Sequence, residues 1–220
     1  TRADTLYCTL PLYHGTALVC WSSVLVGGGT FALRRKFSAS DFWNDIEKYQ
    51  ATIFGYVGEL CRYLLNTESP KSANNTLRVI IGNGLRADLW LEFKERFQIE
   101  EVREVYGASE SNIASLNLFN MDKTTGLIIG PYAIVKYDEE TEEPILDKDG
   151  RVARVEQGEG GLLLGRLTKL VPFTGYTDTS KNKGKLIYGA EKEGDSWFNT
   201  GDIVRDVGCR HMQFLDRKSV

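Results

Sequence analysis

An aromatic ring, a hydroxyl and a carboxylate occur close together in this sequence, and their types could do chemistry. Tyr106, Ser109 and Glu110 lie in the stretch YGASES, residues 106–111, and Gly107 leaves one position of it without a side chain. A tyrosine ring can stack on a purine, a hydroxyl can bond a phosphate oxygen, and a carboxylate can bind Mg²⁺. Glycine lets the backbone approach a ligand closely. Taken alone, these common residue types suit an ordinary turn after a strand at least as well as a loop that binds a nucleotide.

The preceding residues indicate where this stretch lies in the fold. Residues 102–105 (VREV) combine β-branched apolar and charged side chains, which suits a β-strand. In an open parallel sheet, ligands bind at the edge where the strands end. We therefore expect residues 106–111 to leave a strand at a ligand-binding edge.

The first half of the chain alternates strand and helix patterns. We predict strands at residues 30–33, 51–54, 77–81 and 102–105, with helical patterns over residues 42–49, 57–65 and 85–97. Residues 38–41 have the form of a capping box before the first of these helices. The apolar stretch 17–33 is interrupted by three glycines and is too short for a membrane span, so it predicts a buried helix, a turn and a strand. The pattern favours an α/β fold, a parallel sheet with helices on both faces.

The second half of the chain has a different residue pattern. Short β-like runs at residues 132–137, 151–155, 162–166 and 213–215 are separated by turns rich in glycine and aspartate. This pattern predicts a smaller antiparallel β subdomain. We place the boundary between the two parts near residue 120, which gives an α/β subdomain over 1–120 and a β-rich subdomain over 121–220.

Composition excludes some classes of protein. The 220 residues carry a net charge of −3 with acidic and basic side chains interspersed, which argues against nucleic-acid binding. Two histidines and four cysteines without C-x-x-C spacing argue against a structural zinc site and favour reduced thiols in the cytoplasm. Peripheral contact with a membrane and the oligomeric state stay open.

Several stretches together resemble a known family. The chain resembles the adenylate-forming superfamily of acyl-CoA synthetases, luciferases and peptide-synthetase adenylation domains, and more narrowly the long-chain and very-long-chain acyl-CoA synthetases, also called fatty acid transport proteins. The resemblance is carried, in the family's order, by residues 10–15 (LPLYHG), 54–64 (FGYVGELCRYL), 82–86 (GNGLR), 106–110 (YGASE), 175–176 (GY), 197–202 (WFNTGD) and 216–217 (DR).

The resemblance implies a site for ATP. Tyr106, beside Gly107, would pack against adenine, and Gly82, Asn83 and Gly84 would form the opposite wall. A simpler interpretation of Tyr106 is that it caps the sheet.

The resemblance also implies roles in holding phosphate, metal and ribose. Ser109, at a position where most relatives have threonine, would bond a phosphate, and Glu110 would bind Mg²⁺. Asp202 would accept hydrogen bonds from the ribose hydroxyls, with an Asx-turn after Gly201 as the alternative. Arg217 would contact ribose or phosphate near the interdomain hinge. The family continues after this arginine with glycine and aspartate, which this sequence lacks, so the hinge residue stays open.

Three further residues are implied in catalysis and in acyl binding. His14 resembles the family's gate between the nucleotide, acyl and thiol sites, although a helix cap or a core residue is an equal alternative. Tyr56 and Gly58 lie in a region that lines the fatty-acid tunnel in the family, where Gly58 would leave room for the acyl chain.

The resemblance implies a ligase reaction with ATP, Mg²⁺ and coenzyme A. A long-chain fatty acid would attack ATP to give acyl-adenylate and pyrophosphate, and coenzyme A would then displace AMP. The family's phosphate loop and C-terminal domain are not found in the sequence, so we expect a central part of the large domain that is inactive alone. The alternatives are an aryl- or amino-acid-adenylating enzyme, and a protein that binds or takes up fatty acids without ligase activity. The acyl chain length stays open.

Overall fold

The computed structural model describes residues 1–67, 75–107, 112–141, 143–169, 172–173 and 185–217. Ser109, Glu110 and the motif at residues 175–176 lie outside these ranges. The chain divides into two compact units. The first unit comprises Thr1–Val105 and Asn117–Lys123, and the second comprises Tyr106–Leu116 and Thr124–Val220. This division assigns Tyr106–Leu116 to the second unit, whereas the sequence-based boundary near residue 120 assigned it to the first.

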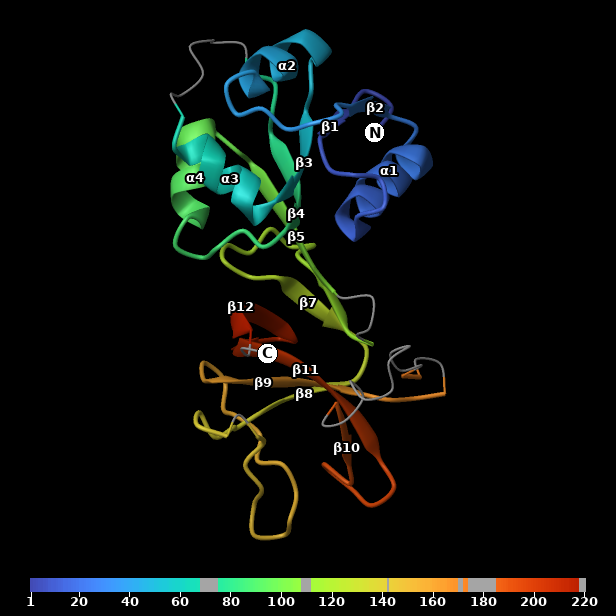
Figure 1. Ribbon diagram of the computed structural model, residues 1–220, viewed down its shortest axis with the longest axis vertical. Helices are drawn as coiled ribbons and strands as arrows, with labels where there is room; N and C mark the ends of the chain where they lie inside the picture. Colours follow the sequence, from blue (N-terminus) through green and yellow to red (C-terminus); the bar gives the residue numbers. More distant parts are fainter. Residues whose placement is uncertain (68–74, 108–111, 142, 170–171, 174–184, 218–220) are drawn as a thin grey trace. The chain divides into compact units, whose positions relative to one another are not determined.

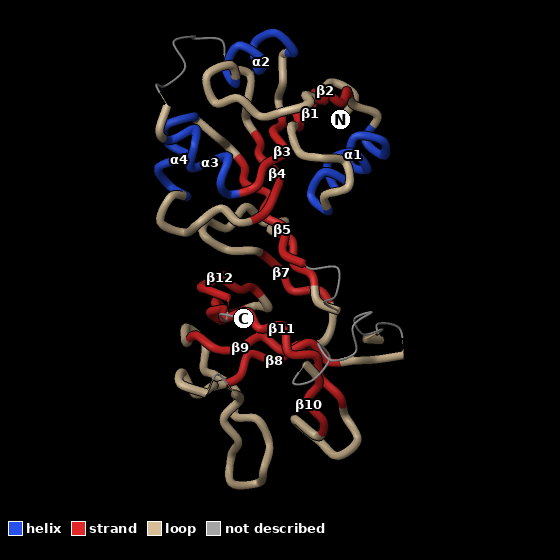
Figure 2. Tube along the Cα trace, viewed as in Figure 1, coloured by secondary structure: helices blue, strands red, loops and turns tan. Residues whose placement is uncertain are grey.

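The first unit is a parallel sheet with helices on both faces. Its elements, in chain order, are β1 (Thr5–Cys8), α1 (Gly15–Gly27), β2 (Thr30–Leu33), α2 (Phe42–Tyr49), β3 (Ile53–Val57), α3 (Gly58–Leu65), β4 (Val79–Asn83), α4 (Trp90–Phe97) and β5 (Glu101–Gly107), whose last two residues belong to the second unit. The strands lie in the order β2, β1, β3, β4, β5, and neighbouring strands are parallel. Figures 1 and 2 show α1 on one side of this sheet and α3 and α4 on the other. The predicted α/β class is confirmed.

The strand order creates a switch point between β1 and β3. The chain leaves β1 through α1 toward one edge of the sheet, and it returns through α2 to place β3 on the other side of β1. Because crossovers are right-handed, α1 must cover the opposite face from the helices that follow. Ligands bind in open α/β sheets beyond the carboxyl ends of the strands at such a point. The loop after β1 and the start of α3 after β3 therefore lie at the favoured edge.

Aromatic side chains fill the core of the first unit. Phe42 of α2 packs edge-on against Phe54 of β3 with 4.8 Å between ring centroids, and both side chains are fully buried. Phe93 and Phe97 of α4 extend this cluster. Their burial stabilises this unit, because each buried phenyl ring contributes about 1.5–3 kcal/mol.

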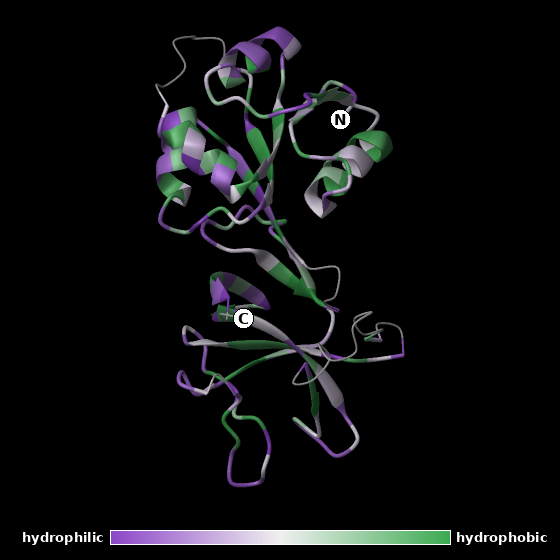
Figure 3. Ribbon diagram, in the orientation of Figure 1, coloured by the Kyte–Doolittle hydropathy of each residue, from purple (hydrophilic) through white to green (hydrophobic). Residues whose placement is uncertain are grey.

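The first helix differs from the prediction of a buried helix. Thr16, Ala17 and Cys20 are its buried residues, whereas Leu25 is 66% exposed and Val26 is 90% exposed. Figure 3 shows the contrast between the apolar α1 and the hydrophilic α2. Apolar composition alone could not predict exposure, because α1 is apolar on most of its circumference and packs with only one side on the sheet.

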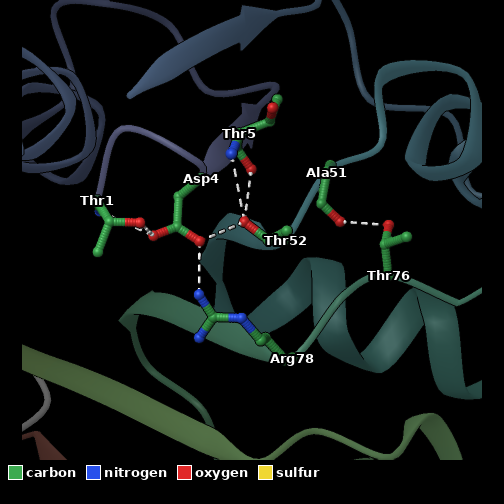
Figure 4. A network of polar contacts seen from close by, with 7 residues as sticks. All are labelled: Thr1, Asp4, Thr5, Ala51, Thr52, Thr76 and Arg78. Carbon is green, nitrogen blue, oxygen red and sulfur yellow. Dashed lines mark hydrogen bonds and ion pairs between the residues drawn. The ribbon is translucent and has the colours of Figure 1, made fainter. Parts of the chain in front are cut away.

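A polar network joins the amino ends of the strands. The Thr52 hydroxyl donates to the Asp4 carboxylate at 2.8 Å, and the Arg78 guanidinium reaches the same oxygen at 2.5 Å (Figure 4). The Thr5 amide donates to the Thr52 hydroxyl at 3.2 Å. Residues that precede β1, β3 and β4 are thus tied together at the edge opposite the carboxyl ends of these strands.

The second unit is an antiparallel sheet. Its strands are β6 (Ala114–Leu116), β7 (Gly126–Ile129), β8 (Tyr132–Val135), β9 (Gly160–Arg166), β10 (Leu186–Tyr188), β11 (Ser196–Gly208) and β12 (His211–Arg217). They lie in the order β6, β7, β12, β11, β9, β8, and β10 pairs with β11. Leu162 and Leu164 of β9 and Trp197 of β11 are buried in one of its clusters. The predicted antiparallel β part is confirmed.

Individual elements follow the sequence pattern unevenly. The strands predicted at 51–54 and 77–81 are present as β3 and β4, each shifted toward the carboxyl end. The strand predicted at 151–155 is wrong, because Val152 and Arg154 make only isolated bridges. In the predicted capping box the Asp41 amide donates to the Ser38 hydroxyl at 3.3 Å, but α2 begins only at Phe42.

No helix within the described ranges is long and apolar enough to span a bilayer.

Candidate functional site

His14 ends the loop after β1 and caps α1. Its Nδ1 accepts a hydrogen bond from the Thr16 amide at 3.2 Å, which satisfies one of the free N–H groups of the first helical turn. The Thr16 hydroxyl donates to the Asn83 side-chain oxygen at 2.5 Å. The motif at residues 10–15 is thereby tied to the end of β4. The cap interpretation of His14 is present in the structure, and the gate role stays a prediction.

Tyr56, Gly82 and Glu104 form one row across the sheet. Tyr56 of β3 pairs with Gly82 of β4, and Gly82 pairs with Glu104 of β5. Aligned residues of parallel strands point to the same face. A Cβ on Gly82 would lie 2.1 Å from the Tyr56 carbonyl oxygen and 2.7 Å from its ring. Gly82 is therefore required for the Tyr56 ring to lie across β4, and the Tyr56 hydroxyl donates to Glu104.

Glu104 is a site residue that the sequence analysis missed. Its side chain is buried, and one carboxyl oxygen accepts hydrogen bonds from the Gly84 amide at 2.5 Å and the Leu85 amide at 3.2 Å. Burial raises the pKa of Glu104 to about 8, although the bonds from Tyr56, Gly84 and Leu85 act in the opposite direction. The sequence contained a signal for it. Glu104 lies two residues from both Val102 and Tyr106 in β5, so its side chain points to the same buried face, where a charged residue is unusual.

Gly58 packs directly against the turn after β4. A Cβ at Gly58 would lie 1.7 Å from the Gly84 carbonyl oxygen. Gly84 itself has a φ of +80°, a conformation that side chains disfavour. The space beside Gly58 is thus filled by the peptide bond between Gly84 and Leu85, which differs from the predicted room for an acyl chain. Tyr56 is fully buried, and contact of either residue with an acyl chain stays a prediction.

In the second unit, a bulge in β11 sets the position of Asp202. Asn199 pairs with Leu164 and Ile203 pairs with Leu162, so three residues of β11 oppose one residue of β9. The bulge is held by the Asn199 side chain, which accepts from the Gly201 amide at 3.0 Å, and by Gly201 at a φ of +75°. Bulges of this kind reorient a side chain beside a functional site. The Asx-type contact belongs to Asn199, which leaves the Asp202 carboxylate free for other bonds.

Asp202 accepts bonds from two of the predicted site residues. The Tyr106 hydroxyl donates to one carboxylate oxygen at 2.5 Å, and the Arg217 Nε donates to the other at 2.6 Å. Asp202 is 1% exposed, whereas the Arg217 side chain is 59% exposed. Burial, and then the charge of Asp202, raise the pKa of the Tyr106 hydroxyl. The structure therefore brings Tyr106, Asp202 and Arg217 together within the second unit.

The predicted phosphate and metal residues are flanked by anchored positions. Ser109 and Glu110 lie outside the described residues, so their roles stay predictions. Gly107, before them, ends β5, and Asn112, after them, donates from its side-chain nitrogen to the Arg166 carbonyl at 2.8 Å. The residues that the structure describes contain no cluster of His, Cys, Asp and Glu that could bind a metal.

The two groups of residues offer different chemistry. The end of β4 offers exposed backbone with little side-chain cover at Gly84, which suits close approach of a flat ring. The Asp202 carboxylate can accept about four hydrogen bonds, of which Tyr106 and Arg217 donate three. An acceptor of this kind suits a ligand hydroxyl.

Comparison with protein families and curated proteins identifies relatives. The family model described as AMP-binding enzyme matches residues 1–164. The chain is 49% identical over 98% of its length to a medium/long-chain-fatty-acid–CoA ligase of Mycobacterium tuberculosis, FadD6, and 41% identical over 97% of its length to long-chain fatty acid transport protein 2 of Rattus norvegicus. It spans 36% of the length of each.

Solved structures share the fold. ATP-bound MatB of Rhodopseudomonas palustris superimposes with a TM-score of 0.72 at 21% identity, covering 99% of this chain and 41% of MatB. A long-chain-fatty-acid–CoA ligase of Archaeoglobus fulgidus gives a TM-score of 0.67 at 19% identity, covering 99% of this chain and 44% of the ligase.

Proposed function

This chain belongs to the AMP-binding enzyme family, and we propose that the full-length protein is an AMP-forming ligase that joins a long-chain fatty acid to coenzyme A. The chain spans only about a third of the curated relatives, 36% of FadD6, so the reaction is assigned to the full-length protein. We expect the 220 residues alone to be a poor catalyst.

The observation that carries the proposal is the arrangement at Asp202. A buried carboxylate on a glycine bulge keeps acceptor capacity, and Arg217 balances its charge. Beside the three bonds from Tyr106 and Arg217, one of the about four acceptor positions of this carboxylate remains for a ribose hydroxyl. Two of the solved structures with this fold are described as bound to ATP and to AMP, which supports nucleotide binding by a protein of this fold.

The residues of this chain would then share the work of the first step. In the second unit, Asp202 would hold the ribose, Tyr106 would lie against adenine and Ser109 would bond a phosphate. In the first unit, the Gly82–Gly84 segment would offer backbone for the adenine. The fatty-acid carboxylate attacks the α-phosphorus, the bond to pyrophosphate breaks, and acyl-adenylate forms. Mg²⁺, held by Glu110, would neutralise phosphate charge. In the second step the coenzyme A thiolate attacks the acyl carbonyl and AMP leaves.

The substrate class follows from the named relatives. Both the mycobacterial ligase and the rat transport protein carry long-chain fatty acids in their names, at 49% and 41% identity. We therefore propose a long-chain fatty acid as the acyl substrate.

The four cysteines of the chain are free thiols, which suits a reducing environment. We propose a cytoplasmic location, to which peripheral contact with a membrane can be added.

The test is the exchange of labelled pyrophosphate into ATP by the full-length protein, measured with different carboxylic acids as the substrate. We expect exchange with palmitate and none with benzoate or with the protein amino acids, followed by palmitoyl-CoA when coenzyme A is added. Exchange supported by benzoate or an amino acid, and not by palmitate, would identify a different adenylating enzyme.

A second candidate function is fatty-acid binding for uptake, which the names of the transport-protein relatives favour. It predicts palmitate binding that is indifferent to ATP and that survives Asp202→Ala. The ligase proposal predicts that the same variant loses pyrophosphate exchange, so one variant separates the two functions.

A further inference from the structure

The turn after β4 has little in its own sequence to fix its shape. Gly84 has no side chain, is exposed, and adopts a φ of +80°, where glycine has wide conformational freedom. The next residue, Leu85, is buried, so its amide needs an acceptor inside the protein. The shape of this turn must therefore be set by a group from another element.

Glu104 supplies that group from β5. One oxygen of its carboxyl accepts from the amides of Gly84 and Leu85, at 2.5 Å and 3.2 Å. Two amides that point at one oxygen fix the direction of both peptide planes. The carboxyl replaces the backbone acceptor that a regular turn would provide.

The carboxyl is itself held at its other oxygen. The Tyr56 hydroxyl donates to it, and the Tyr56 ring reaches it only because Gly82 has no side chain. Tyr56 is in turn fully buried, so its own position is fixed by packing. The titratable groups that act on Glu104 are Tyr56 and Cys61, and burial raises the pKa of both, which leaves them neutral near pH 7. Each oxygen of the Glu104 carboxyl is thus held by a neutral group, one by the Tyr56 hydroxyl and the other by the two backbone amides.

We propose that Glu104 is a positioning residue for the nucleotide, acting through the amides of Gly84 and Leu85 to hold the backbone surface on which the adenine ring lies. The inference rests on the proposed function, because it assigns the adenine to that surface. Glu104 touches no reacting atom. Its effect is to order the turn before the nucleotide arrives, so that the nucleotide does not have to order it on binding.

Two substitutions separate positioning from charge. Glu104→Gln keeps an oxygen that can accept from both amides and an NH₂ group that can donate to Tyr56, but it removes the ionisable group. Glu104→Asp keeps the ionisable group but withdraws it by one carbon–carbon bond, about 1.5 Å, which breaks the contact with the amides. A role in positioning makes the aspartate variant the worse of the two.

The experiment measures the dissociation constants of AMP and of palmitate for the full-length protein and its variants by calorimetry, with the melting temperature recorded without ligand. We expect Glu104→Gln to bind AMP within about 3-fold of the wild type and Glu104→Asp to bind it about 10-fold more weakly or worse. Palmitate binding should fall less than AMP binding in Glu104→Asp, since Glu104 bonds the amides of the turn directly and could reach an acyl chain only through Tyr56.

Asp4→Asn is the matched control. It alters another buried carboxyl of the same unit, in the network at the amino ends of the strands. We expect it to lower the melting temperature and leave the dissociation constant of AMP unchanged. This result would show that loss of a buried carboxylate alone does not weaken AMP binding.

The outcomes are distinct. Wild-type-like AMP binding by Glu104→Asp overturns the positioning role, and so does an equal loss of AMP and palmitate binding, because that pattern indicates a general defect of the fold. A folded wild-type protein that binds palmitate and no AMP contradicts the proposed function itself.

Discussion

Replacing Gly58 with alanine should damage the turn after β4 without adding charge or removing a polar group. The added Cβ would lie 1.7 Å from the Gly84 carbonyl oxygen and 2.5 Å from its carbonyl carbon. Real Cβ atoms do not come closer than 3.0 Å to such atoms. The obstacle is backbone, which cannot rotate away as a flexible side chain does. Either α3 or the turn must therefore move by more than about 1 Å.

The magnitude follows from this displacement. Forcing an extra methyl group into a packed site costs about 1–3 kcal/mol, and we expect the upper end because two backbone segments are involved. The same displacement moves the Gly82–Gly84 segment, where adenine is proposed to lie. A misplacement of about 1 Å can cost about 10²-fold in rate, so adenylate formation should fall by about that factor.

The assay is palmitate-dependent exchange of pyrophosphate into ATP, with the melting temperature measured on the same samples. Gly27→Ala is the matched control, because the nearest atom to its added Cβ is 3.9 Å away. We expect Gly58→Ala to lose both exchange and stability and Gly27→Ala to keep both. A Gly58→Ala variant with the wild-type melting temperature and the wild-type rate of pyrophosphate exchange would contradict the close contact between Gly58 and Gly84.

Three further substitutions test other parts of the account. Glu110→Ala should reduce acyl-adenylate formation by about 10²-fold or more, as loss of a metal or charge-stabilising contact does, and normal activity would remove the metal assignment. Tyr106→Phe removes the hydroxyl that donates to Asp202 and should lower the free energy of unfolding by about 1.5–3 kcal/mol, since that bond is to a charged acceptor; unchanged denaturant stability would contradict this. The pKa of Glu104 is raised from 4.5 to about 8, so between these values the folded chain keeps a proton that the unfolded chain has lost. This contribution to stability is complete below about pH 4.5 and is lost as the pH rises to about 8, at about 1.4 kcal/mol per pH unit, and a Glu104→Gln variant with the same pH slope as the wild type would refute it.

Local periodicity predicted the class of the fold. The alternation of strand and helix patterns gave the parallel sheet, and the glycine-separated short runs gave the antiparallel part. The strand β1 was missed, because Thr5–Cys8 is short and buried and has no alternation. The strand predicted at 151–155 failed, because alternation shows that a segment can form a strand but not which partner it meets.

The candidate site was predictable where a motif carries its own chemistry. Tyr106, Asp202 and Arg217 were identified by residue type and resemblance, and the structure brings them together. Glu104 and the reason for Gly58 were not found, because both depend on contacts with Gly84. Those contacts exist only after β3, β4 and β5 have aligned.

The central claim is that this sequence holds an adenylate through Asp202. The most direct test is a calorimetric titration of the full-length protein with a non-hydrolysable palmitoyl-adenylate analogue, beside an Asp202→Ala variant shown to be folded. The account predicts tight binding by the wild type and a loss of about 10-fold or more in the variant, as expected when a charged hydrogen-bond acceptor is removed. Equal binding by both proteins, or no binding by a folded wild type, would contradict it.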